Sequence, residues 1–495
     1  MTGRNGSTAG GPQRSGLARG TLRVLLAESL VVPAGLVTAA FLGRAFGPAD
    51  FGLFMLAASI VLTLQWMVVA MFSRATVKLV TEAADWRPAG AAVLRWNAGA
   101  GTAMALGLWL VSGRLAVALG EPLLAPTLTL FALEIPIGSA AAACRSVLSG
   151  LEAYRARAMT GALRWILRPL LIIGLVQLGF SVTGAVAGSI LAAAATFVVA
   201  QSLARVPLTA GAFPAGRLWR LALPVFALAV SLRLLDRVGL FALKAFGGTA
   251  DEVGWYAAAQ GLAVVPGLFA MSFTPLLLAA LTAALARGDE ATARRVAHIA
   301  LRLAIGFLPL AAFGAAAAPE LIDALFGPGF EPAATLAGPL LLAATALAVI
   351  SVSTAILIAK DRVTQAGACL WPVLPIAVMA HTVVVPRFGP AGAAMVTCAA
   401  ACVGAVATVT VVFTVWRLDA PGGTFVRSVL VGCGVAVLAV LWPAPGAWVI
   451  LKGAVATLAI AAGFAALGEF GPEDRELARR IMRGPASAPA HSPAV

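Results

Sequence analysis

Three charged residues lie together in the middle of an apolar segment, LALPVFALAVSLRLLDRVGLFALKAF: Arg233, Asp236 and Arg237. Their i, i+3, i+4 spacing places them on one face of a helix. Charges inside an apolar membrane segment cost ~2.5–3.5 kcal/mol each on insertion scales, so we expect them to face a cavity or a partner. Two guanidinium groups exceed one carboxylate, and their planar forks suit phosphate oxygens. The pattern predicts an anion-binding wall; the alternative is a structural Arg–Asp pair that joins two helices.

Other polar residues in apolar segments are secondary candidates. Glu134 lies near the middle of its segment, just before Pro136. We expect it either to carry a coupling proton or ion, or to pair with an arginine of the seventh span. His298 and Arg302 are spaced i, i+4, so they could receive a phosphate, with contact to boundary water as the alternative. His381 lies alone near an expected helix end and receives little weight.

The composition indicates which solvent surrounds the elements that position these residues. The chain has 495 residues, of which 61% are hydrophobic and 11% charged. Soluble domains average about 25% charged residues, so we expect an all-α integral membrane protein. The net charge of +14 is carried by segments between the apolar runs, which favours membrane topology over nucleic-acid binding. The five cysteines lie within apolar runs and form no ligand set, so no metal is expected.

About 20 apolar residues suffice to cross a membrane as a helix. We predict fourteen spans, at roughly 22–43, 52–74, 91–112, 123–149, 160–180, 183–204, 218–245, 253–279, 294–317, 333–358, 363–385, 390–416, 425–443 and 447–468. The predicted organisation is a disordered cytoplasmic N-terminus at 1–20, an N-lobe at 21–210, a C-lobe at 211–418, two further helices at 419–470 and a cytoplasmic tail at 471–495.

The basic residues orient these spans. With a cytoplasmic N-terminus, 28 of the 35 Lys and Arg residues fall in cytoplasmic segments and nearby helix ends, 5 fall on the opposite side and 2 lie within a span. Positive charge accumulates on the cytoplasmic side of membrane proteins. We therefore expect both termini to be cytoplasmic.

One pattern occurs twice in the chain. FLGRAFGPADFGLF at 41–54 is echoed by FALKAFGGTADEVGWY at 241–256, where Arg44 matches Lys244. In the same pair of segments Gly47 matches Gly247 and Gly52 matches Gly254. We expect Arg44 and Lys244 to face each other across a pseudo-twofold axis, at the outer mouth of a cavity.

The repeat extends over two lobes. Gly184 matches Gly392 at an offset of 208 residues, so spans 1–6 repeat as spans 7–12. Six is an even number, and the two lobes are therefore parallel repeats, with the ligand site expected between them near the midplane.

The chain lacks the motifs of common catalytic sites. It contains no G-x-x-x-x-G-K-[ST], no H-E-x-x-H and no G-x-S-x-G. We therefore expect no enzyme and no cofactor, but a secondary transporter with H+ or Na+ coupling carried by Glu134 or Asp236.

Several stretches resemble one known family. They are GRAFGPADFGLFMLAASI, VGWYAAAQGLAVVPGLFAMSFTPLLL, ARGDEATARR and ELIDALFGPGFEPAATLAGPLL. Together they resemble bacterial polysaccharide flippases, whose superfamily also includes multidrug and toxin exporters and the lipid II flippase. The resemblance implies two six-helix lobes around a cationic cavity in the cytoplasmic membrane. It also implies that a polyprenyl-pyrophosphate-linked oligosaccharide moves from the inner to the outer leaflet.

The expected partners are membrane lipid, this lipid-linked oligosaccharide and polysaccharide polymerase or glycosyltransferase machinery. In this hypothesis Arg233 and Arg237 hold the phosphates and Asp236 orients them. One alternative is a drug or cation antiporter of the same fold, which would need an acidic cavity. Another is a non-transporting subunit of a polysaccharide assembly.

Overall fold

The computed structural model describes residues 23–24, 26–209, 215–418, 421–446 and 448–469. The predicted disordered segment at 1–20 and the tail at 471–495 lie outside the described residues. Within the described ranges, all regular structure is helical, as predicted. The helices are α2 (Val31–Glu82), α3 (Arg87–Ala118), α4 (Leu124–Phe131), α5 (Glu134–Gly150), α6 (Tyr154–Leu175), η1 (Val176–Phe180), α7 (Ser181–Ala204), α8 (Ala215–Ala245), α9 (Ala250–Leu262), α10 (Val264–Ala286), α11 (Glu290–Ile305), α12 (Leu308–Ala316), α13 (Ala318–Phe326), α14 (Ala333–Ala359), α15 (Val363–Leu370), α16 (Val373–Trp416), α17 (Gly422–Leu441) and α18 (Trp448–Ala466).

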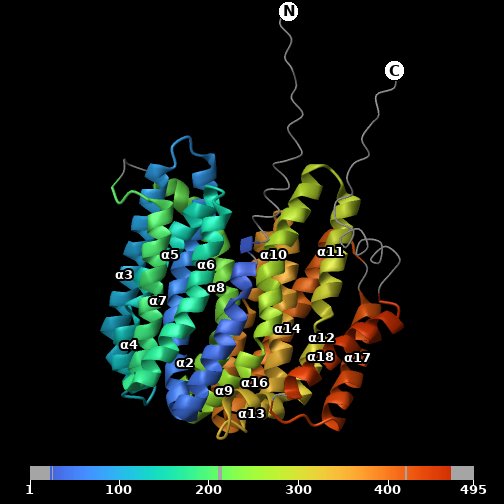
Figure 1. Ribbon diagram of the computed structural model, residues 1–495. Helices are drawn as coiled ribbons and strands as arrows, with labels where there is room; N and C mark the ends of the chain where they lie inside the picture. The colour runs from blue at the N-terminus through green and yellow to red at the C-terminus, as the bar shows by residue number, and fades with distance from the viewer. Residues whose placement is uncertain (1–22, 25, 210–214, 419–420, 447, 470–495) are drawn as a thin grey trace, which may run out of the picture.

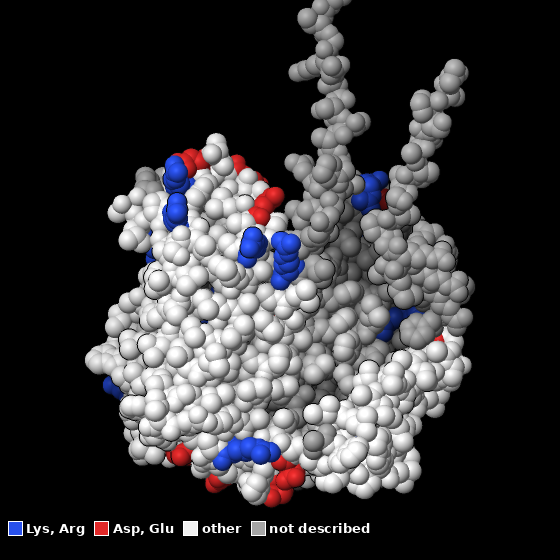
Figure 2. All heavy atoms as spheres, in the orientation of Figure 1, with Lys and Arg blue, Asp and Glu red and all other residues white. Residues whose placement is uncertain are grey.

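Ten helical stretches in the described part of the chain are long and apolar enough to cross a membrane. Three of them exceed 50 residues and contain a residue with non-helical backbone angles: Gly47, Gly179 and Gly389. A 30 Å hydrocarbon layer needs only about 20 helical residues, so each of these three stretches is long enough to cross twice. The protein is thus a multi-pass membrane protein, while the count of fourteen spans stays a prediction. Most charged residues visible in Figure 2 lie near the two ends of the bundle.

The helices gather into two groups and a C-terminal pair (Figure 1). In the first group α2 packs on α5, α3 on α5, and α6 on α7; we call α2–α7 the N-half. In the second, α14 packs on both α16 and α10, and α16 on α8; we call α8–α16 the C-half. The pair α17 and α18 lies against the C-half through α12. The exact lobe boundaries stay predictions.

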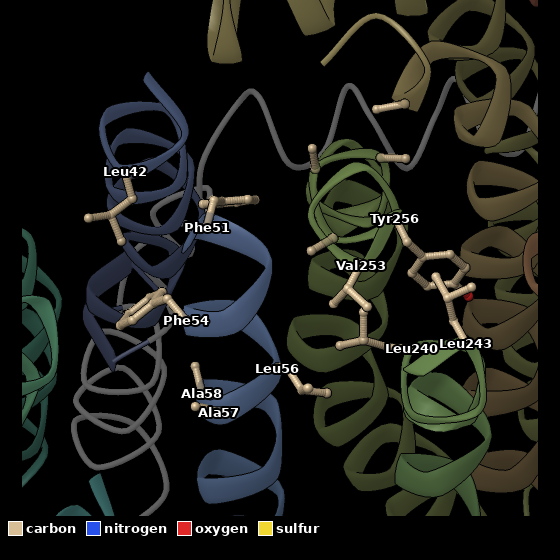
Figure 3. Packing of buried hydrophobic residues seen from close by; sticks show 14 of the residues in the cluster. Leu42, Phe51, Phe54, Leu56, Ala57, Ala58, Leu240, Leu243, Val253 and Tyr256 are labelled. Atoms are coloured by element: carbon tan, nitrogen blue, oxygen red, sulfur yellow. The ribbon is translucent and has the colours of Figure 1, made fainter. Parts of the chain in front are cut away.

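The halves meet where α2 contacts α8 and α9. One apolar cluster includes Leu42 and Phe51 from α2 together with Leu243 and Tyr256 from the C-half, all of them fully buried (Figure 3). This contact lies near the turns at Gly47 and Gly247, and we call that end of the bundle the Gly47 end.

The repeated glycines Gly52 and Gly254 make this contact possible. A Cβ at Gly52 would collide with the carbonyl oxygen of Ala250, and a Cβ at Gly254 with that of Pro48. In each half, the repeated glycine has no side chain at this point, and this lets α2 and α9 approach each other. Close helix packing is therefore the structural reason for the repeated glycine.

Candidate functional site

A cavity of about 170 Å³ lies between the two halves and is lined by α2, α6 and α8. Most of its wall is small or apolar, with contributions from Ala34, Gly35 and Met55 on α2. Its cationic side chains are Arg233 and Arg237 from the C-half and Arg168 from the N-half. Arginines from opposite halves thus converge on one apolar pocket.

Arg233, Asp236 and Arg237 share a helix face, as their spacing predicts. Asp236 Oδ2 lies 3.4 Å from Arg233 Nη1 and 3.2 Å from Arg237 Nε. The three side chains are 24%, 34% and 23% exposed in chain order, so all are half-buried. Asp236 pairs with both arginines on its own helix, and the two arginines also line the pocket. The Arg–Asp pairing and the cationic cavity wall are therefore both present.

Neighbouring side chains hold this triplet in place. Arg237 Nη1 donates to Gln260 Oε1 at 3.0 Å, and Gln260 Nε2 donates to the backbone oxygen of Asp236 at 3.0 Å. The Arg233 guanidinium lies 5.9 Å from the ring centroid of Trp66, in cation–π range and across the interface between halves. These contacts fix both guanidinium groups at the cavity wall.

Arg168 was missed as a site residue. The sequence showed it only as one of several arginines near the end of a span, four residues after Arg164. The structure places it on the cavity wall opposite α8. Its Nε and that of Arg233 are buried and have no hydrogen-bond partner among the described residues. Such groups are costly to leave unsatisfied, so an anionic ligand in the pocket would relieve them.

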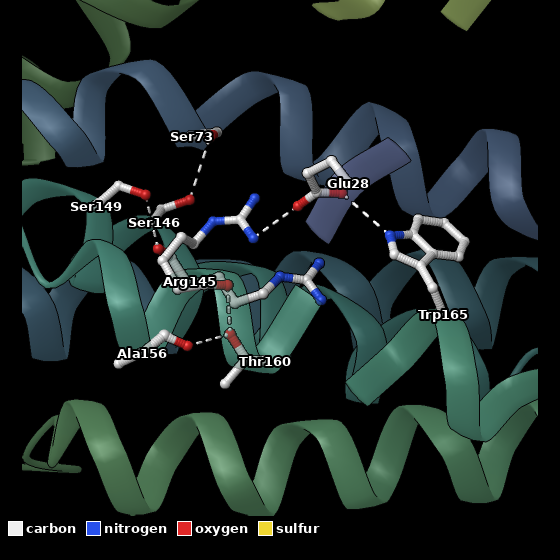
Figure 4. A network of polar contacts seen from close by, with 9 residues as sticks. Glu28, Ser73, Arg145, Ser146, Ser149, Ala156, Thr160 and Trp165 are labelled. Carbon is white, nitrogen blue, oxygen red and sulfur yellow. Dashed lines mark hydrogen bonds and ion pairs between the residues drawn. The ribbon is translucent and has the colours of Figure 1, made fainter. Parts of the chain in front are cut away.

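Glu134 is not among the residues that line this cavity, and its contacts within the described residues include none on α8. It is fully buried, 3.0 Å from Arg164 Nη2 on α6, and accepts a hydrogen bond of 2.6 Å from the Ser189 hydroxyl on α7. The expected pairing with an arginine of the seventh span is wrong, because α6 and α7 cover the carboxylate. Glu28 has a similar arrangement: its carboxylate lies 2.7 Å from Arg157 Nη1 and accepts from Trp165 Nε1 at 3.1 Å (Figure 4).

Comparison with known proteins gives this arrangement a family. The model of the family described as "Polysaccharide biosynthesis protein" matches residues 17–278, more than half of the chain. The chain belongs to this family. Among curated protein sequences, none matches it significantly.

Solved structures show that the fold of this family member is shared more widely. The lipid II flippase MurJ, in an inward closed conformation, superposes with a TM-score of 0.73 at 13% identity, covering 92% of this chain and 99% of that one. The Vibrio cholerae MATE transporter VcmN, in its bent form, gives 0.58 at 16%, covering 81% and 97%. The eukaryotic MATE transporter AtDTX14 gives 0.59 at 12%, covering 84% and 97%. The fold is therefore MurJ- and MATE-like.

In this member of the family, Arg302 is not among the residues that line the cavity. Its guanidinium contacts Glu469, just beyond α18, and Arg427 and Thr424 of α17 bind the same carboxylate. Burial raises the pKa of Glu469, but the hydrogen bonds from Thr424, Arg427 and Arg302 outweigh it and hold the pKa below its usual value. Arg302 thus ties the C-terminal pair to the C-half.

Arg44 and Lys244 both lie at the Gly47 end, but each binds a segment of the other half. Arg44 of the N-half donates to the backbone oxygens of Leu325 and Ala324 at 3.0 and 2.6 Å, at the last turn of α13. Lys244 of the C-half lies 2.7 Å from Glu121, between α3 and α4. The two contacts are reciprocal, since each links one half to the other, and the face-to-face arrangement of Arg44 and Lys244 at a cavity mouth stays a prediction.

Proposed function

We propose that the protein is a flippase that moves a polyprenyl-pyrophosphate-linked oligosaccharide from the inner to the outer leaflet of the cytoplasmic membrane, by alternating access through the cavity between its halves. The observation that carries this proposal is the convergence of Arg168, Arg233 and Arg237, from both halves, on one pocket. The description of the family as polysaccharide biosynthesis proteins and the similarity to MurJ, a lipid II flippase, support the same cargo class.

The charges favour an anion over a cation. Three guanidinium groups line the pocket and Asp236 is the acid paired with two of them, which leaves an excess of positive charge. A pyrophosphate offers several oxygens to guanidinium forks, and each charge-assisted hydrogen bond contributes about 1.5–3 kcal/mol. The drug or cation antiporter, although it shares the fold, would need the opposite sign in this pocket.

The contacts at the Gly47 end supply the second element of alternating access. With the cytoplasmic orientation expected for both termini, the Gly47 end faces outward. Arg44 and Lys244 then hold the outer side closed while the pocket accepts its ligand from the cytoplasmic leaflet. Reopening requires those cross-half contacts to break, and the polyprenyl tail stays in lipid while the head group crosses. Polysaccharide polymerases or glycosyltransferases would supply and consume this cargo.

The test is a flipping assay in proteoliposomes with a fluorescent polyprenyl-pyrophosphate-linked N-acetylglucosamine as the probe. Arg168→Ala, Arg233→Ala and Arg237→Ala are each expected to slow flipping at least about 10-fold, from the loss of a charge-assisted hydrogen bond. Arg114→Ala, which removes an exposed arginine on α3, is the matched control and should keep the normal rate.

Three results would overturn the proposal. Normal flipping in all three folded cavity variants would remove the anion site. Export of a small cationic dye by the unmodified protein, lost in Glu134→Gln, would instead establish the cation antiporter. A purified protein that flips nothing while remaining folded would favour the non-transporting subunit.

A further inference from the structure

A second polar network lies inside the C-half, away from the arginines. His381 of α16 is fully buried. Its Nδ1 lies 2.6 Å from the backbone oxygen of Ala377, so this nitrogen carries the hydrogen in the neutral ring. Nε2 is then the acceptor, 3.5 Å from the Thr397 hydroxyl. His381 lies alone near the expected end of an apolar span, and spacing within that span does not indicate that its ring is buried.

The network continues toward the cavity. Thr397 Oγ1 lies 3.2 Å from the Tyr256 hydroxyl on α9, and both residues are buried. Tyr256 and Gln260 are four residues apart and share a face of α9. Gln260 in turn accepts from Arg237, so a chain of polar contacts and one helical turn connect His381 to the cavity guanidinium.

The approach of α8 to this network requires a glycine. A Cβ at Gly239 would collide with the hydroxyl groups of both Tyr256 and Thr397. Gly239 lies three residues after Asp236 on the same helix. The hydroxyl groups of Tyr256 and Thr397 therefore contact α8 within one turn of the anion site.

The surroundings of His381 provide partners for a second ring hydrogen. The ring nitrogens face the backbone oxygen of Ala377 on one side and the Thr397 hydroxyl on the other. An imidazolium has two N–H donors, and acceptors are present at both nitrogens. Histidine is the side chain whose ordinary pKa, ~6.5, lies nearest physiological pH.

The helices packed against α16 differ in the number of charges that they carry. These helices are α8, α9, α14 and α15, and α14 and α15 contain no Asp, Glu, Lys or Arg. The charged residues of the other two and of α16 itself are Arg217, Arg220, Arg233, Asp236, Arg237 and Lys244 on α8, Asp251 and Glu252 on α9, and Arg387 on α16. Of these, Asp236 and Arg237 are the pair that the Tyr256–Gln260 face reaches. A charge gained at His381 would therefore act mainly on the anion site.

We propose that His381 is a proton-binding site that couples the protonation state of the C-half to the cavity. This proposal rests on the proposed function, for which it supplies the coupling ion. A hydronium ion transfers a proton to the Nε2 lone pair: one N–H bond forms, one O–H bond breaks and water is left. The reverse transfer returns the proton to water later in the cycle. Thr397 can no longer donate to Nε2, so its hydroxyl must turn toward Tyr256. The change reaches α8 at Gly239 and Arg237 through Gln260.

The test measures protonation and conformation without any substrate. The chain has three histidines, so 15N-histidine NMR resolves His381 once His298→Gln and His491→Gln remove the others. The 15N shifts of the His381 ring are expected to change as the pH is lowered, as the second nitrogen takes up a proton. In a cysteine-free background, spin labels at Lys78→Cys and Arg287→Cys, exposed positions on α2 and just after α10, report the distance between halves. This distance should change over the same pH range.

The variant His381→Gln keeps a polar amide but cannot take up the proton, and the pH-dependent distance change is expected to disappear. His298→Gln, in the same half, is the matched control and should retain it. Should His381→Gln not fold, Thr397→Val removes the hydroxyl partner and should shift the titration midpoint.

A ring that does not titrate, or a pH response unchanged in His381→Gln, would overturn the proton site. So would a distance change driven by Na+ at fixed pH and unaffected by this variant. These measurements use no lipid-linked substrate and no variant of the three cavity arginines, so the anion site is tested separately by the flipping assay.

Discussion

The two halves place a hydroxyl group at the same position of their repeated helices, but give it different partners. Ser189 and Thr397 are 208 residues apart, the offset that also relates Gly184 to Gly392. Ser189 donates to Glu134, which is paired with Arg164, whereas Thr397 lies next to a neutral imidazole. One duplicated framework thus contains an ion pair in the N-half and a chain of neutral groups in the C-half.

This difference implies different mechanical roles. A buried ion pair is costly to separate, since each charge loses its oppositely charged partner in an apolar interior. The neutral chain of His381, Thr397 and Tyr256 can reverse its hydrogen bonds without exposing a charge. We therefore expect the N-half to behave as a rigid unit, and the C-half, which carries most of the anion site, to respond to protonation.

The largest effect is expected from breaking the ion pair of the N-half. Glu134→Ala leaves Arg164, only 9% exposed, without its carboxylate, and should destabilise the folded protein by about 3–5 kcal/mol. Thermal unfolding of the purified protein in detergent measures this change. The double variant Glu134→Leu with Arg164→Met should recover much of the loss and still flip lipid. If it folds but no longer flips, Glu134 is a coupling residue, as the sequence first suggested.

The contacts that join the halves at the Gly47 end provide the next largest effect. Lys244 is 5% exposed and binds a carboxylate, whereas Arg44 is exposed and binds neutral carbonyl groups. Glu121→Ala should therefore weaken closure by about 2–3 kcal/mol, and Arg44→Ala by less, because a buried ammonium loses more than an exposed guanidinium. Reactivity of a cysteine placed between the halves at this end measures opening. Equal reactivity in the two variants would contradict the ranking.

The sequence was sufficient to predict the parts of this molecule that depend on local pattern. Apolar runs predicted membrane helices, the echo of Gly52 by Gly254 predicted a duplication, and i, i+3, i+4 spacing placed Arg233, Asp236 and Arg237 together. Residues that meet only through tertiary packing could not be placed this way. Arg168 reaches the cavity, Arg302 reaches Glu469, and Thr397, the partner of His381, reaches Tyr256 on a helix far apart in sequence. Their environments depend on which helix faces are adjacent, which spacing within one helix does not specify.

The smallest effect is expected from a pair of substitutions that remove one hydroxyl group from each half. Because the two positions are equivalent, this pair compares the halves most directly. Ser189→Ala takes a 2.6 Å hydrogen bond from a buried carboxylate and should cost about 1.5 kcal/mol of unfolding free energy. Thr397→Val takes neutral hydrogen bonds of 3.2 and 3.5 Å and should cost about 0.5 kcal/mol. Unfolding should show the larger loss for Ser189→Ala at every pH, whereas the pH dependence of the distance between halves should change only in Thr397→Val. A pH response that depends on Ser189 would instead assign the proton-responsive site to the N-half. The reason is that a hydroxyl group affects the pH response only where its hydrogen-bond partner takes up the proton.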